Sequence, residues 1–248
     1  SALGIAAIDF TLSKELQGHY KRAPAAGTLF SSAMEQSDMP SRADGKRHLI
    51  LVMVESLGQP LKNPEMQRLL FEKYRKSDAV LSRYELSSGT TPFFGSTTRG
   101  EIREMCGRWG EYYPLMAEAD DRCLPNQLSK KGYDTVAMHS FNGVFFDRSQ
   151  WYPNIGFRQS YFADDLVKKG ASKCGGVFPG ACDRDVPKLM SDALKSRLPW
   201  VVNAALILPS VLVVFTGAML TLNPGYLSGE RVDGGFFARY NPASEFRS

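Results

Sequence analysis

Apolar runs alternate with amphipathic segments between residues 47 and 197. Residues 49–54 read LILVMV without polar alternation, which is typical of a strand buried on both faces of a parallel sheet. Further strands are expected within 79–86 and 133–139, and helices near 61–75, from Thr98, near 123–131 and over 183–196. This order predicts an α/β fold with a mainly parallel sheet flanked by helices.

Two polar residues follow apolar strands of this predicted sheet. Glu55 comes directly after residues 49–54, and His139 ends the strand expected over 133–139. Ligands of open α/β sheets bind beyond the carboxyl ends of the strands, so both residues are candidates for a site. Each also fits a plain structural role, Glu55 as a solvated acid and His139 as a hydrogen-bonded strand-end histidine.

A cluster of hydroxyl side chains precedes one of the expected helices. Ser96, Thr97 and Thr98 come just before an amphipathic segment, so one of the threonines is a natural helix N-cap, with Glu101 near the capping-box position. A cap with no further role is one interpretation. The other is an anion site, because a helix N-terminus offers unpaired N–H groups and a partial positive charge to a phosphate or sulfate.

Three segments together carry a family resemblance. They are LVMVES at 51–56, GSTTRGEIREMCG at 95–107, and HSFNGVFFDR at 139–148 followed by Tyr152 and Gly156. In order and spacing they resemble the alkaline phosphatase and sulfatase superfamily. The closer resemblance is to the membrane-anchored branch with lipoteichoic acid synthase, the phosphoglycerol transferases and, more remotely, the phosphoethanolamine transferases.

The resemblance implies roles for five residues. Thr97 would be the nucleophile and, with Glu55, a metal ligand, whereas His139, Arg148 and Phe146 would contact the substrate. The implied activity is that of a metal-dependent phosphotransferase or hydrolase acting on a phosphodiester head group of phosphoglycerol or phosphoethanolamine type. The substrate would be a phospholipid or glycan. The divalent metal could be Mn²⁺, Zn²⁺ or Mg²⁺, because two ligands do not fix a geometry.

Arg148 also has a structural interpretation as a surface residue that pairs with Asp147 or Asp165. Such exposed pairs are common and contribute little to stability. An arginine is nonetheless well suited to bidentate recognition of a phosphate.

The metal ligands of the family's later half are missing from this chain. The family supplies an Asp-His pair and another histidine there, but the three histidines of this chain are His19, His48 and His139. The catalytic domain is therefore incomplete relative to the family. An alternative to the enzyme is a catalytically incomplete domain that only binds an anionic lipid or glycan.

The four cysteines form two close pairs, Cys106 with Cys123 and Cys174 with Cys182. Without a Cys-x-x-Cys spacing or a nearby histidine, two short-loop disulfides are expected rather than a zinc site, which indicates an oxidising compartment such as a bacterial periplasm. The alternative is four unpaired buried thiols in a cytosolic protein. The net charge of +4 and the lack of basic runs with interleaved aromatics give no support to nucleic-acid binding.

An uncharged stretch follows the predicted catalytic domain of residues 47–197. Its apolar part is long enough for a transmembrane helix over 198–224, which would place the protein at a bacterial inner membrane with a periplasmic domain. The alternative is two buried strands, 200–208 and 211–216, separated by Pro209. Residues 1–46 are expected to be a membrane-proximal segment and linker, residues 225–248 are a tail of unknown role, and no feature indicates the oligomeric state.

Overall fold

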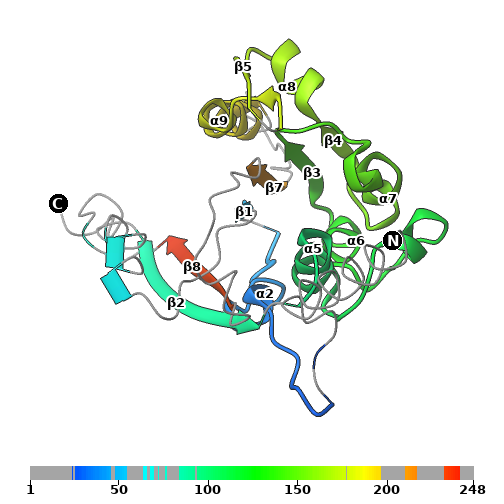
Figure 1. Ribbon diagram of the computed structural model, residues 1–248, viewed down its shortest axis with the longest axis vertical. Coiled ribbons are helices and arrows are strands. Elements are labelled where there is room, and N and C mark those ends of the chain that lie inside the picture. Colours follow the sequence, from blue (N-terminus) through cyan, green and yellow to red (C-terminus); the bar gives the residue numbers. More distant parts are fainter. Residues whose placement is uncertain are drawn as a thin grey trace, which may run out of the picture. The chain divides into compact units, whose positions relative to one another are not determined.

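The computed structural model divides the chain into two compact units (Figure 1). One unit comprises residues 1–37, 57–96 and 221–248, and the other comprises 38–56 and 97–220. The described residues are 24, 26–45, 48–54, 64–65, 68–69, 72, 76, 84–92, 94–176, 178–196, 210–216 and 232–240, of which 85–87, 196, 210–216 and 232–240 are described by their backbone alone.

The second unit holds the parallel sheet. Its described elements are β1 (Leu49–Val54), α5 (Thr97–Cys106), η1 (Tyr113–Met116), α6 (Leu124–Lys130), β3 (Asp134–His139), η2 (Phe145–Asp147), α7 (Arg148–Asn154), β4 (Gln159–Tyr161), α8 (Ala163–Lys168), β5 (Lys173–Cys174), β6 (Gly180–Ala181), η3 (Asp183–Asp185), α9 (Val186–Ser196) and β7 (Ser210–Thr216).

The sheet has the strand order β1-β7-β3-β4, and every pairing in it is parallel. Its register places Met53, Phe215 and His139 in one row across three strands. The carboxyl ends of β1 and β3 therefore meet at the same edge of the sheet, and the predicted α/β fold with a mainly parallel sheet is confirmed.

Strand β7 corrects the prediction for the apolar stretch. Residues 210–216 lie between β1 and β3 as a strand, so a continuous transmembrane helix over 198–224 is wrong for this part of the stretch. The second strand of the alternative, 211–216, is confirmed within one residue. Every helix in the described part of the chain is too short or too polar to span a bilayer. An apolar run without charge suits an interior strand as well as a membrane helix, and pairing on both sides decides for the strand here.

Burial differs between the outer strand β1 and the inner strand β3. All residues of β3 after Asp134 are buried, whereas β1 alternates, with Ile50, Val52 and Val54 exposed. The prediction that residues 49–54 are buried on both faces is therefore wrong for one face. An uninterrupted apolar run does not report which face is covered, because that depends on the elements packed against it.

The core on one side of the unit joins β3 to two helices. Its buried members come from β3, α8, the β5–β6 region and the start of α9: Val136, Met138, Leu166, Ala171, Ala181 and Val186. Leu189, Met190 and Ala193 of α9 pack against them at helical spacing. Full burial of one such aliphatic side chain stabilises the fold by about 1.5–3 kcal/mol. This cluster confirms the amphipathic helix expected over 183–196, of which residues 183–185 form a 3₁₀ turn.

The first unit is built on an antiparallel strand pair. Strand β2 (Tyr84–Pro92) pairs along its length with β8 (Val232–Tyr240), and the short helix α2 (Ala33–Gln36) contacts β2 through Gln36, which donates to the carbonyl of Thr90 at 2.8 Å. Of the strand expected within 79–86, residues 84–86 are confirmed and 79–83 lie outside the described residues, while β2 continues beyond the expected end to Pro92. Its partner is a distant part of the chain, which local sequence does not reveal. The domain boundaries at 46, 197 and 224 stay predictions.

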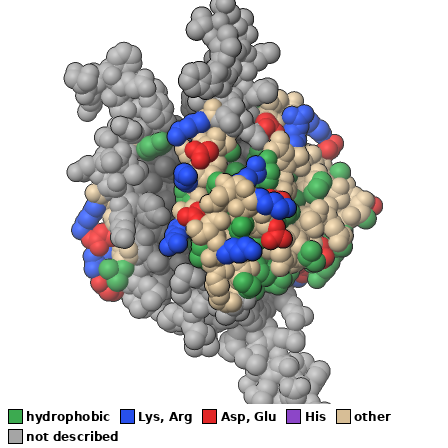
Figure 2. All heavy atoms as spheres, turned by 90° about the horizontal axis from the view of Figure 1, so that it is seen from above, with side chains coloured by type: hydrophobic (Ala, Val, Ile, Leu, Met, Phe, Trp, Pro, Cys, Tyr) green, Lys and Arg blue, Asp and Glu red, His purple; other side chains and the backbone are tan. Residues whose placement is uncertain are grey.

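Charged side chains of both signs are mixed on the face shown in Figure 2. Lys130 and Asp121 form one exposed ion pair, at 2.7 Å. Pairs of this kind contribute about 0–1 kcal/mol each. The stability of the fold therefore depends on its buried contacts more than on such surface pairs.

A glycine fixes the approach of α7 to α6. Gly156 has a φ of +107°, and a Cβ there would lie 2.3 Å from the backbone nitrogen of Asn126. The side chain of Asn126 donates to the carbonyls of Asp120 and Asn154 at 2.9 and 3.1 Å. The end of α7 is therefore held against the start of α6 at a distance that only glycine permits.

We expect Gly156→Ala to destabilise the chain more than Gly170→Ala does. Both glycines have a positive φ, +107° and +105°, but a Cβ at Gly170 meets nothing within 4 Å. Both variants should lose about 1–2 kcal/mol from backbone strain, and Gly156→Ala should lose about 1–3 kcal/mol more from the clash. Urea unfolding measures the difference, and equal losses would contradict the close approach.

Candidate active site

The structure describes four of the five predicted site residues. Thr97 is the first residue of α5, His139 the last residue of β3, Phe146 lies in η2, and Arg148 begins α7. Glu55 follows β1 in the sequence but lies outside the described residues.

The second and third motif segments are joined by a buried ion pair. Arg148 and Glu101 both have 0% exposed side chains, and Nη2 of the arginine donates to Oε1 of the glutamate at 2.5 Å. Nε of Arg148 lies 3.2 and 3.3 Å from the two carboxylate oxygens, and the hydroxyl of Tyr152 donates to Oε2 at 3.1 Å. Two charges taken out of water need this degree of mutual satisfaction to be tolerated.

The guanidinium of Arg148 has further neighbours in the loop before α7. Its Nη1 donates to the carbonyl of Phe145 at 3.3 Å, and its Cζ lies 5.3 Å from the ring centroid of Phe146, a cation–π contact. The interpretation of Arg148 as a surface residue is wrong, because the side chain is fully buried. Its predicted contact with a substrate head group stays a prediction.

Thr97 lies one helical turn before Glu101. Residues four apart share a face of a helix, so Thr97 lies on the same face of α5 as Glu101. Glu101 is the residue of this face that bonds to Arg148 and Tyr152. Thr97 is partly exposed, whereas Thr98 has an exposed fraction of only 1%. Of the two threonines, Thr97 is thus the one that a ligand can reach.

His139 is a strand-end histidine with a local hydrogen bond. It is 1% exposed, and its Nδ1 accepts the backbone N–H of Phe141 at 3.0 Å. The structural interpretation of this residue is confirmed. Because Nδ1 acts as an acceptor, Nε2 is the N–H donor of the neutral ring.

Two consecutive residues beside Arg148 have left-handed backbones. Phe146 has a φ of 57° and Asp147 a φ of 53°, an arrangement that costs about 1–3 kcal/mol for each residue that is not glycine. Trp151 Nε1 donates to the Phe146 carbonyl at 2.9 Å, and the Tyr112 hydroxyl donates to the Asp147 carboxylate at 3.0 Å. Burial raises the pKa of Tyr112 well above its usual value, and the bond to Asp147 raises this pKa further, so the hydroxyl stays a donor.

Glu101 is the residue that sequence reasoning missed, since it was interpreted only as part of a helix cap. A usable signal was present in the third segment. Arg148 and Tyr152 are four residues apart, which places a cation and a hydroxyl on one face of α7. When this face is buried, both donors need an acceptor from another element.

The described residues do not make a metal site by themselves. Within the described ranges no group of three or more His, Cys, Asp or Glu side chains could hold a metal ion. Of the two predicted ligands, the structure describes Thr97 alone. A catalytic zinc usually takes three protein ligands, and the described residues do not supply that number.

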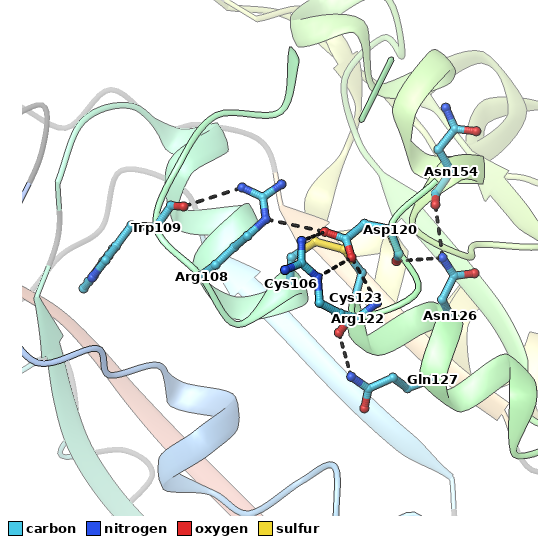
Figure 3. A network of polar contacts seen from close by, with 9 residues as sticks. All are labelled: Cys106, Arg108, Trp109, Asp120, Arg122, Cys123, Asn126, Gln127 and Asn154. Carbon is cyan, nitrogen blue, oxygen red and sulfur yellow. Dashed lines mark hydrogen bonds and ion pairs between the residues drawn. A yellow bond between two sulfur atoms is a disulfide. The ribbon is translucent and has the colours of Figure 1, made fainter. Parts of the chain in front are cut away.

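Both predicted disulfides are present. Cys106, the last residue of α5, is bonded to Cys123 just before α6, and Cys174 in β5 is bonded to Cys182 after β6 (Figure 3 shows the first). The alternative of four unpaired thiols is wrong. The first disulfide ties the carboxyl end of the Thr97 helix to the start of the next helix.

A polar network surrounds this disulfide (Figure 3). Asp120 accepts hydrogen bonds from the backbone N–H, Nε and Nη2 of Arg122 at 3.0, 2.9 and 2.9 Å, and Nε of Arg108 lies 3.6 Å from it. The hydrogen bonds from Arg122 are the main cause that lowers the pKa of Asp120 to about 2. The carboxylate therefore fixes the turn that precedes Cys123.

This pKa predicts how Asp120 affects stability in acid. Because the pKa is lower in the folded state than its ordinary value of 3.8, the carboxylate contributes stability that is present near neutral pH and is lost as pH falls toward 2. We expect Asp120→Asn to cost about 1–2 kcal/mol at pH 6 and much less at pH 2. Urea unfolding at both pH values tests this, with the exposed Asp121→Asn as the control. A cost that does not depend on pH would contradict the assignment.

The buried ion pair of Glu101 and Arg148 leads to a second prediction, about the free energy of unfolding. Glu101→Gln should cost about 3–5 kcal/mol, because it leaves the Arg148 guanidinium buried without its counter-charge. Removing both charges, as Glu101→Leu with Arg148→Met, should recover much of that loss. The control is Glu111→Gln, whose partner Arg99 is partly exposed and whose pair is worth about 1 kcal/mol at most. Urea unfolding decides, and equal losses at positions 101 and 111 would contradict a buried pair.

Comparison with known proteins gives structural likeness only. No family model matches the chain, and no curated protein matches its sequence. Three solved structures have a similar fold. They are the lipoteichoic acid synthase LtaP from Listeria monocytogenes (15% identity, TM-score 0.49, 82% of this chain), an alkaline phosphatase superfamily protein from Vibrio parahaemolyticus (15%, 0.45, 69%), and the phosphoglycerol transferase GacH from Streptococcus pyogenes with sn-glycerol-1-phosphate (16%, 0.44, 98%).

The chain spans 46%, 40% and 57% of the lengths of these three proteins, respectively. By name they are a lipoteichoic acid synthase, a member of the alkaline phosphatase superfamily and a phosphoglycerol transferase.

Proposed function

We propose that this chain acts in phosphoryl transfer, on a phosphodiester head group of phosphoglycerol or phosphoethanolamine type carried by a phospholipid or glycan. Thr97 is the nucleophile in this proposal. The observation that supports it best is the buried contact of Glu101 with Arg148 and Tyr152. That contact joins the Thr97 helix to the segment that follows His139, so two motif segments far apart in sequence are in direct contact.

The proposed chemistry has two displacements at phosphorus. The hydroxyl oxygen of Thr97 forms a bond to phosphorus while the bond from phosphorus to the leaving oxygen breaks, and the Thr97 proton passes to that oxygen, so that an alcohol departs and phospho-Thr97 remains. The oxygen of an acceptor hydroxyl or water then bonds to phosphorus, the bond from phosphorus to Thr97 breaks, and the proton of the attacking group returns to Thr97. The first N–H groups of the ten-residue α5 are suited to hold the phosphate oxygens during both steps.

The remaining predicted residues have positioning roles in this proposal. Nε2–H of His139 is a donor for a phosphate oxygen, and Phe146 carries the strained backbone that directs Arg148 inward. In this proposal Arg148 positions the Thr97 helix through its ion pair with Glu101, and its positive charge also attracts the phosphate. A divalent metal, Mn²⁺, Zn²⁺ or Mg²⁺, at Glu55 and Thr97 belongs to the proposal because the resemblance implies it, and it would supply activation of the hydroxyl when bound.

A second candidate is binding without turnover. It is favoured by the sequence, in which no histidine follows His139 and no Asp-His pair occurs. A domain of this kind would hold an anionic lipid or glycan through the α5 N-terminus and His139. It differs from the enzyme in that loss of the Thr97 hydroxyl would leave binding nearly unchanged.

The two disulfides support an extracytoplasmic location. Such bonds persist in oxidising compartments and are rare in the cytosol. We therefore keep the bacterial periplasm as the proposed compartment. Attachment to the inner membrane stays a prediction.

The Thr97 hydroxyl gives the direct test. We expect Thr97→Ala to lower turnover of a chromogenic phosphodiester with Mn²⁺ or Zn²⁺ by at least about 10²-fold, because the nucleophile is gone. Thr97→Ser retains a hydroxyl and is the control, with turnover expected within about tenfold of the original chain. Full turnover in Thr97→Ala would contradict the nucleophile. Binding of sn-glycerol-1-phosphate without turnover in any variant would select the second candidate.

A further inference from the structure

A short disulfide-closed segment is docked against the strand end that carries His139. The Cys174–Cys182 bond closes residues 174–182 into a small hairpin of strands β5 and β6. At one end of it the N–H of Ala181 donates to the carbonyl of Ser140 at 2.8 Å. Ser140 directly follows His139, so the hairpin is bonded to the backbone of the predicted head-group segment.

The approach between the two backbones is close enough to require glycine. A Cβ at Gly180 would lie 2.1 Å from the carbonyl oxygen of Ser140. Backbone atoms cannot yield as a flexible side chain can, so a larger residue at this position must move the hairpin or the His139 segment. By contrast, a Cβ at Gly175, in the same disulfide loop, would meet nothing within 4 Å.

An aromatic contact makes the second attachment. The ring of Phe178 lies 5.4 Å from Phe141 in an edge-to-face arrangement and 5.6 Å from Phe145. Phe141 and Phe145 themselves pack edge to face at 5.3 Å. Aromatic pairs of this geometry each contribute about 0.5–1.5 kcal/mol beyond the burial of their area.

These contacts reach the two residues whose backbones matter most for the site. Phe141 gives its N–H to Nδ1 of His139, and the carbonyl of Phe145 accepts from Arg148. The base of the hairpin is anchored elsewhere, because the Cys182 N–H donates to the Ser172 carbonyl at 2.8 Å and the Ser172 N–H donates to Asp185 at 2.7 Å. The hairpin therefore holds the predicted head-group segment, residues 139–148, at a fixed position relative to η3.

We propose that the Cys174–Cys182 hairpin is the positioning element of the head-group site, and that the ring of Phe178 contacts the ligand and favours ligands with a carbon-bearing group on the phosphate. The inference rests on the proposed function for the nature of the ligand. Phe141, whose backbone N–H bonds to Nδ1 of His139, packs with Phe145 and Phe178, and these three rings offer apolar surface to the glyceryl part of a glycerol phosphate. Inorganic phosphate has no such part and gains nothing from the rings.

Two glycine variants test the positioning without a ligand. Hydrogen–deuterium exchange followed by mass spectrometry is measured over residues 139–148 for Gly180→Ala and for the control Gly175→Ala. We expect exchange to rise about tenfold in Gly180→Ala, as local opening becomes easier, and to stay unchanged in Gly175→Ala. Equal exchange in the two variants would overturn the proposal, whatever the chain binds.

Phe178 variants test the effect on ligand choice. We expect Phe178→Ala to raise the Kd for sn-glycerol-1-phosphate about five- to tenfold and that for inorganic phosphate less than about twofold. Phe178→Tyr keeps the ring and should restore the original Kd. In turnover of a chromogenic phosphodiester, Phe178→Ala should raise KM and leave kcat unchanged. Equal weakening for both probes, or no rescue by tyrosine, would overturn the role of Phe178 in ligand choice.

Hydrogen–deuterium exchange and ligand binding together distinguish a failure of this inference from a failure of the proposed function. If the original chain binds neither probe, the proposed function fails, and the exchange difference between the glycine variants still decides the positioning. If Thr97 is needed for turnover but Gly180→Ala leaves exchange and KM as they were, the function holds and the inference fails.

Discussion

A carboxylate and a guanidinium that are both removed from water are tolerated only when each satisfies the other, and Glu101 and Arg148 are both fully buried. Because the Tyr152 hydroxyl takes part as well, the pair fixes the first turns of α5 and α7 relative to each other. Thr97 lies one helical turn before Glu101, so the ion pair also fixes the position of the Thr97 backbone. The geometry of the candidate site therefore depends on an ion pair beneath it more than on the residues that would touch a ligand.

Covalent and polar restraints complete the frame around this pair. The Cys106–Cys123 bond holds the far end of α5, and Asp120 holds the turn that leads into that bond. At the other side of the site, Phe146 and Asp147 have left-handed backbones, and Trp151 donates to the carbonyl of Phe146 while Tyr112 donates to the carboxylate of Asp147. Strain of this kind persists where the surroundings over-determine the backbone, which is what a pre-organised ligand site needs.

The elements with strong local signals could be predicted from the sequence. Strand β3, and the helical segment formed by η3 and α9 together, begin and end within about one residue of the expected bounds, because an apolar run and an amphipathic repeat determine them. Strands β7 and β8 could not be predicted in the same way, since their state depends on partners far along the chain. The disulfides were predictable because two close cysteine pairs leave few alternatives.

The identity of the site residues stays a prediction, whereas the contacts of the described ones differ from what the sequence indicates. The motifs selected Thr97, His139 and Arg148, yet a motif does not report whether an arginine faces a ligand or a buried acid. Arg148 is buried against Glu101, so it can be required for the contact between α5 and α7 without touching a ligand. Loss of activity on substituting such a residue would therefore not identify a ligand contact. A substitution of Arg148 can change both the stability of α5 and the binding of a ligand through the same guanidinium. The role of Arg148 can therefore be assigned only when both effects are measured on the same variant.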